Sequence, residues 1–149
     1  MPDVLVASTW SFPLFLHIFG AMVLVGGLLV GAVALALGRS DDRVLRIGYR
    51  SLLLVALPGF VAMRVGAEWT ASREGWHDVE DEPAWLGIGY ITADAGALLL
   101  LVSLILGGIG LRRLRQGGGS GLLKATLALS LLMLAAYVVA IWAMGAKPT

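Results

Sequence analysis

The side chains best suited to chemistry in this sequence are a histidine, an arginine and two carboxylates that fall within or beside long apolar runs. His17 is the only titratable residue in the run Phe12–Leu37, Arg64 stands four residues before Glu68 in a second run, and Asp94 is the only charge in a third. A neutral imidazole can bind iron or another metal, whereas carboxylates and arginine form ion pairs or relay protons. The sequence therefore predicts a metal or haem ligand, a structural ion-pair network or a proton pathway.

The runs that carry these residues indicate an integral membrane protein. The 149 residues are 58% hydrophobic and only 14% charged, with a mean hydropathy of +0.87, which is too apolar for a water-soluble domain of this size. A helix needs about 20 apolar residues to cross about 30 Å of hydrocarbon, and long unbroken runs favour helices over a closed barrel. The absence of cysteine excludes thiolate ligands and iron–sulfur clusters, so redox chemistry requires a bound cofactor.

Four apolar segments define the elements that must position the polar side chains. We expect membrane-spanning helices at about residues 10–37, 44–69, 85–111 and 122–145, forming one all-α domain over residues 1–149. Pro58 should kink the second helix, because proline lacks a backbone donor. The N-terminal residues lack the pattern of a cleaved signal peptide, so we expect the first helix to be retained.

Charge asymmetry predicts how the helices lie in the membrane. The loops after the first and third helices carry most of the basic residues, namely Arg39, Arg43, Arg46, Arg50, Arg112, Arg113, Arg115 and Lys124. The opposite side has Arg73, Lys147 and the acidic segment 74–82. By the positive-inside rule both termini lie outside. We therefore expect a four-helix transmembrane bundle of two parallel-related hairpins.

The polar side chains are predicted to meet in the outer half of this bundle. With three flanking tryptophans as interface markers, His17 lies about 10 Å, Arg64 about 7 Å and Asp94 about 13 Å below the outer interface. A charge at such depth costs about 2.5 to 3.5 kcal/mol unless it is paired or hydrated. We predict an inward-facing cluster that also contains Glu68 and Tyr90. Its simplest interpretation is structural, with Arg64 paired to Asp94 or Glu68 and His17 hydrogen-bonded to a neighbour.

A sharper interpretation makes His17 an axial ligand of b-type haem. Gly20 and Gly27 share its helix face, and a glycine-lined face can admit either a flat macrocycle or a second helix, of which the GxxxG pair of Gly27 and Gly31 favours the helix. Arg64 would then meet a propionate. No second histidine lies in an apolar run, so the iron would be five-coordinate, share a second His17 across a homodimer, or take a methionine. The candidate methionines are Met22, Met63 and Met144.

Further expectations concern ions and partners. Asp94, Glu68 and His17 can relay protons, or the kinked helix can gate a small pore, and four spans would then require oligomerisation. The acidic segment 74–82 has no ordered ligand spacing, so a solvated loop is favoured over a metal site.

The expected partners are the lipid bilayer and a second copy or a larger membrane complex, with no nucleic acid. These residues name no reaction, and a non-enzymatic accessory subunit remains an alternative.

The segment FLHIFGAMVLVGG, with His17 followed by Gly20 and the Gly26, Gly27 pair, resembles the first helix of small bacterial multi-helix membrane proteins. These are uncharacterised predicted integral membrane proteins, to which ALPGFVAMRVGAEW and PAWLGIGYITADAG are also similar, and more distantly the copper-resistance-D-like and HemJ-type (protoporphyrinogen oxidase) families. The HemJ resemblance implies haem on the histidine that matches His17. The lysine that it also implies in a later span has no counterpart here, which argues against that oxidase activity. The copper-family resemblance implies metal handling, but no methionine or histidine pathway supports it.

Overall fold

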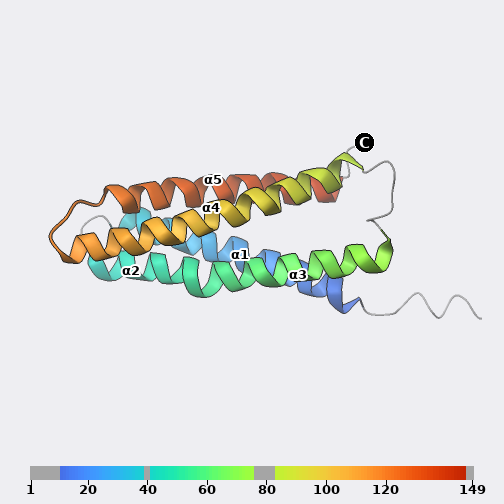
Figure 1. The fold of residues 1–149 in the computed structure, drawn as a ribbon, viewed down its shortest axis with the longest axis horizontal. Coiled ribbons are helices and arrows are strands. Elements are labelled where there is room, and N and C mark those ends of the chain that lie inside the picture. The colour runs from blue at the N-terminus through green and yellow to red at the C-terminus, as the bar shows by residue number, and fades with distance from the viewer. Residues whose placement is uncertain (1–10, 39–40, 76–82, 147–149) are drawn as a thin grey trace, which may run out of the picture.

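The computed structural model describes residues 11–38, 41–75 and 83–146. Within these ranges the chain forms α1 (Phe12–Leu37), α2 (Asp42–Ser51), a π-helical turn η2 (Leu52–Ala56), α3 (Leu57–Glu74), α4 (Ala84–Arg115) and α5 (Gly121–Ala146). The helices lie side by side in an elongated bundle (Figure 1). These ranges contain no strand, and the predicted all-α four-helix bundle is confirmed.

Four helical segments are long and apolar enough to cross a membrane, which makes the chain a multi-pass membrane protein. They are Phe12–Leu37, Asp42–Glu74, Ala84–Arg115 and Gly121–Ala146, the second of which joins α2, η2 and α3. Large apolar side chains are exposed along all four segments, as suits contact with lipid. The second and third helices run past their predicted ends at residues 69 and 111, because polar residues beyond the hydrocarbon can continue a helix. The predicted start at residue 10 lies outside the described residues.

The bundle has two chemically distinct ends. The α1–α2 and α4–α5 connections lie at one end (Figure 1), which we call the basic end because its helix termini carry Arg43, Arg46, Arg112, Arg113, Arg115 and Lys124. Asp41 caps α2 there by accepting hydrogen bonds from the backbone N–H groups of Arg43 and Val44. The other end, where α1 begins and α5 finishes, is called the His17 end.

A π-helical turn precedes Pro58, the residue at which the sequence predicts a perturbed helix. Proline has no N–H to donate to the preceding turn, and its ring crowds that turn. The backbone before Pro58 forms the π-helical turn η2, in which the Leu57 N–H donates to the carbonyl of Leu52, five residues back. Such single π-helical turns insert extra backbone without ending the helix, so α2 and α3 remain one span.

Glycines bring α1 into close contact with the second span, which consists of α2, η2 and α3. A Cβ placed on Gly27 would lie 2.6 Å from the Ala56 nitrogen, and one on Gly59 would lie 2.5 Å from the Leu24 nitrogen. The same register continues along the pair, with each glycine facing a residue on the partner helix. The facing pairs are His17 with Gly66, Gly20 with Met63, Leu24 with Gly59, Gly27 with Ala56, Gly31 with Leu52, Leu35 with Gly48, and Gly38 with Leu45. This confirms helix packing as the role predicted for the GxxxG pair.

The α4–α5 hairpin packs through positions alternately three and four residues apart. A Cβ on Gly96 would meet the Tyr137 hydroxyl, and one on Gly110 would lie 3.0 Å from Leu123 Cγ. Buried positions follow this spacing along most of both helices. On α4 they are Ala93, Gly96, Leu100, Ser103, Gly107 and Gly110, with Leu104 also buried, and on α5 they are Leu123, Thr126, Ser130, Met133, Tyr137 and Ala140, followed by Ala143. This is the knobs-into-holes spacing of antiparallel helix pairs.

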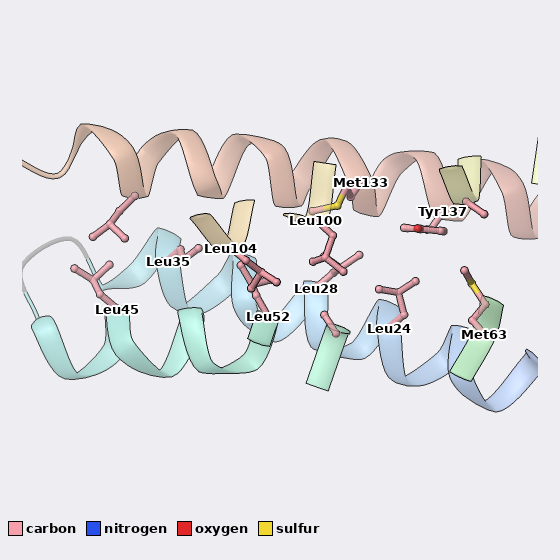
Figure 2. Packing of buried hydrophobic residues seen from close by; sticks show 13 residues of the cluster. Leu24, Leu28, Leu35, Leu45, Leu52, Met63, Leu100, Leu104, Met133 and Tyr137 are labelled. Atoms are coloured by element: carbon pink, nitrogen blue, oxygen red, sulfur yellow. The ribbon is translucent and has the colours of Figure 1, made fainter. Parts of the chain in front are cut away.

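One apolar core joins the two hairpins. Leu24 and Leu28 of α1, Leu52 of η2, Leu100 of α4 and Met133 of α5 are at most 1% exposed, and Figure 2 shows them meeting between the helices. The hairpins contact each other mainly through α1 and α5, whereas α3 and α4 touch little. The seam between α3 and α4 is therefore the weakly packed side of the bundle.

Candidate functional site: a polar layer at the His17 end

His17 is fixed by a hydrogen bond that its ring donates to a backbone carbonyl of the neighbouring helix. Pro13 in the first turn of α1 suits a helix start, and one turn later His17 faces Gly66, where an added Cβ would lie 2.8 Å from the His17 Cα. The His17 Nδ1 lies 3.0 Å from the Met63 carbonyl oxygen. A carbonyl only accepts, so Nδ1 carries the proton and Nε2 keeps its lone pair in the neutral ring. The predicted hydrogen bond of His17 to a neighbour is present.

Arg64 is the centre of the charged cluster. Its Nη2 lies 3.1 Å from Glu68 Oε1 on the same helix and 3.1 Å from Asp94 Oδ1 on α4, and its guanidinium lies 5.4 Å from the centre of the Tyr90 ring. The sequence left open whether Arg64 pairs with Asp94 or with Glu68, and the structure has both. One guanidinium between two carboxylates leaves a formal charge of −1.

The pair of Arg64 and Asp94 crosses the weakly packed α3–α4 seam. The Arg64 side chain is 30% exposed and the Asp94 side chain is 70% exposed, so the cluster opens to the outside of the bundle at Asp94. This differs from the predicted inward-facing arrangement, because α3 and α4 are too far apart to bury both partners. An exposed ion pair in water contributes little, but an apolar surrounding removes the solvent screening that weakens it.

Tyr137 of α5 belongs to the same end of the bundle and was not singled out from the sequence. It is 5% exposed and lies within electrostatic range of Arg64, and Figure 2 shows it at the Met63 end of the core. Its hydroxyl has no hydrogen-bond partner among the described residues, as is also true of Ser103. The signal that could have revealed it is its spacing from Thr126, Ser130 and Met133, which puts a lone tyrosine on the buried face of an apolar helix.

Of the two glycines expected to line a haem, Gly20 lies against α3 and Gly27 lies against η2. A Cβ on Gly20 would lie 2.7 Å from the Met63 Cα, and one on Gly27 would lie 2.9 Å from the Ala56 Cα. A macrocycle on this face would have to displace α3 from α1. Of the residues expected to hold haem, only His17, through its Nε2, and Arg64 keep a group that could contact it. Arg64 already has two carboxylate partners.

The other predicted ligands are dispersed. Met22 is 68% exposed on the outside of the bundle, Met63 is buried in the core, and the Met144 side chain covers Gly89. No group of three or more histidine or carboxylate side chains that could hold a metal ion occurs within residues 11–38, 41–75 and 83–146. Of the acidic segment 74–82, residues 76–82 lie outside the described part of the chain.

Fold and site together define a four-span membrane bundle with a histidine and an arginine-centred ion-pair cluster at one end. Searches against protein-family models, curated proteins and solved structures found no match to this chain. Any function must therefore be argued from the polar layer itself, which consists of His17, Arg64, Glu68, Tyr90, Asp94 and Tyr137.

Proposed function

We propose that this chain is a non-enzymatic accessory subunit of a larger membrane assembly. In this role the polar layer fixes the two hairpins relative to each other and presents Asp94 to a partner chain. The observation that carries the proposal is the geometry around Arg64, which pairs with Glu68 and Asp94 at 3.1 Å while the Asp94 side chain stays 70% exposed.

The position of Asp94 explains why a partner is needed. Asp94 lies about 15 Å along α4 from Ala84, immediately before the charge-free stretch 95–111. A carboxylate at hydrocarbon depth costs about 2.5 to 3.5 kcal/mol unless it is paired or hydrated. Arg64 approaches Asp94 from one side only, and it also pairs with Glu68. A cationic or hydrogen-bond-donating side chain on another membrane helix would complete the cluster.

The same proposal includes an orientation. The basic end carries the arginines of two connections, so the positive-inside rule puts it in the cytoplasm of a bacterium and the His17 end near the outer face of the inner membrane. A partner would then reach Asp94 from the outer leaflet.

The proposed assembly with a partner is tested by measuring the size of the complex that contains this chain after detergent extraction. The full chain, expressed at its native level and extracted in mild nonionic detergent, should migrate as a complex larger than the 15.7 kDa of one chain. Asp94→Ala should release it as a single chain. The matched control is Asp42→Ala, which removes an exposed carboxylate paired to Arg46 at 4.0 Å and should leave the complex intact. A wild-type single chain, or a complex that survives Asp94→Ala, refutes the proposal.

The structural part of the proposal is tested by a double-mutant cycle. Arg64→Gln, Asp94→Asn and the double variant should show a coupling free energy of at least about 0.5 kcal/mol in detergent unfolding. Glu68→Gln, which removes only the partner within α3, should not weaken the link between α3 and α4. Additive effects of the two substitutions would mean that the pair does not hold the hairpins together.

Binding of b-type haem is a second candidate, favoured by one observation. Metal-ligating histidines usually donate their second ring N–H to a carbonyl or carboxylate, and His17 does so to the Met63 carbonyl at 3.0 Å. His17 Nε2 would be the iron ligand, with Gly20 and Gly27 remaining in the helix contact. Haem would supply one-electron redox chemistry.

The haem candidate has a direct spectroscopic test. The purified protein, supplied with haem, should show a Soret band that His17→Ala abolishes. His77→Ala, which changes the only other histidine of the chain, should leave the band unchanged. A preparation that stays colourless after haem addition rejects this candidate and leaves the accessory role standing.

A further inference from the structure

A shallow groove of about 500 Å³ lies between α2 and α4 near the basic end, remote from the polar layer. Its lining comprises Tyr49 of α2 and, on α4, Leu104, Ile105, Gly108, Ile109 and Arg112. One wall is thus aromatic, the floor is apolar, and one end is cationic.

Glycines of α4 create the groove. A Cβ on Gly107 would lie 2.7 Å from Tyr49 Cδ2, and one on Gly108 would lie 3.1 Å from the Tyr49 hydroxyl oxygen. The Tyr49 ring therefore rests directly against the α4 backbone. Because α2 and α4 touch little elsewhere, the space beside this ring stays open to the surroundings of the bundle.

The groove crosses from apolar to charged surface along α4. Leu104 lies within the charge-free stretch 95–111, and Arg112 is the first charge after it, about 12 Å further along the helix. Arg112 is exposed and has no acidic partner among the described residues. An arginine at the boundary between hydrocarbon and headgroups lies at the depth of the phosphate groups of the bilayer.

We propose that this groove binds one anionic phospholipid. An acyl chain lies along Leu104, Ile105 and Ile109 beside the Tyr49 ring, and the phosphate pairs with Arg112. The charge of the site selects the lipid, because the guanidinium forms charge-assisted hydrogen bonds to phosphate and the surrounding basic end attracts a net negative headgroup. The site shares no residue with the polar layer, so it stands whether or not the chain is an accessory subunit.

Native mass spectrometry of the delipidated full chain in neutral detergent tests the proposal. The first phosphatidylglycerol should bind about tenfold more tightly than phosphatidylcholine with the same acyl chains, and Arg112→Gln should remove this preference. Arg113→Gln is the matched control, because the next residue is turned about 100° away from the groove. Ile105→Trp, which keeps Arg112 and fills the groove, should also abolish the first binding event.

Three results would overturn it. Equal binding of the two lipids means that the groove does not select charge. Equal losses in Arg112→Gln and Arg113→Gln mean that a diffuse basic surface attracts the lipid. Competition by soluble glycerol phosphate means that Arg112 binds phosphate without the acyl chain.

Discussion

The neighbouring glycines Gly26 and Gly27 offer a sharp test of how closely α1 and η2 approach. A Cβ on Gly26 would have no heavy atom of a neighbour within 4 Å, whereas one on Gly27 would lie 2.6 Å from the Ala56 nitrogen and 3.0 Å from the Ala56 Cβ. Gly27→Ala and Gly26→Ala thus add the same methyl group to the same helix. Only the first forces the two backbones apart.

The magnitude follows from these distances. Ordinary contact begins at 3.4 Å, so α1 and η2 must separate by about 0.8 Å, the difference from 2.6 Å, at this level. A gap of that size forfeits about a quarter to a half of the dispersion energy of the affected contacts, and such overpacking costs about 1 to 3 kcal/mol. Alanine also favours a helix over glycine by up to about 1 kcal/mol. We expect Gly26→Ala to be neutral or stabilising relative to the wild type, and Gly27→Ala to be less stable than Gly26→Ala by about 1 to 3 kcal/mol.

Unfolding in mixed micelles of a mild detergent and dodecyl sulfate, followed by tryptophan fluorescence, measures both variants in one assay. The difference between them removes the helix-propensity contribution, which they share. Equal stabilities would show that η2 does not lie against Gly27. That result would also reopen the glycine face of α1 to a flat ligand.

Two further substitutions test individual polar groups in the same assay. Tyr137→Phe removes a buried hydroxyl without a hydrogen-bond partner among the described residues, so the free energy of unfolding should stay equal or rise by up to about 1 kcal/mol. A marked decrease in the free energy of unfolding would mean that the Tyr137 hydroxyl does have a hydrogen-bond partner. Ser51→Ala removes the hydrogen bond that the Ser51 hydroxyl donates to the Gly27 carbonyl at 2.9 Å, and should cost about 0.5 to 1.5 kcal/mol. No change would mean that this bond is not formed.

The architecture was predictable because its signals are local. Four long apolar runs specify four helices, and the spacing of Arg64 and Glu68 puts both side chains on one helix face, as found at 3.1 Å. The contact across the seam to Asp94 was also among the expected pairs. The pairing of Arg64 with Asp94 follows from their similar depths below the outer membrane interface, because charges at one level of an apolar bundle are stabilised by pairing.

What the sequence did not reveal depends on backbone atoms and on register. The partner of His17 is the Met63 carbonyl, and a main-chain oxygen has no side-chain signature. The contact between Tyr137 and Gly96 depends on the register of α4 against α5. The residue pattern of a single helix does not contain this register. The π-helical turn before Pro58 was likewise expected only as a kink, because proline specifies a lost donor and not how the backbone adjusts.

The spacing of the facing residues has a consequence for how each hairpin coils. From Ala93 to Gly110 on α4 and from Leu123 to Ala140 on α5, buried residues recur in alternate steps of three and four, an average of about 3.5 that winds two helices around each other in a left-handed supercoil. The contacts of α1 with the second span contain two successive steps of four, Gly27 to Gly31 to Leu35, opposite η2 and the end of α2. Such a stutter locally unwinds the supercoil. The two hairpins therefore differ in twist midway along their length, so a rotation that superposes their ends would not superpose their middles.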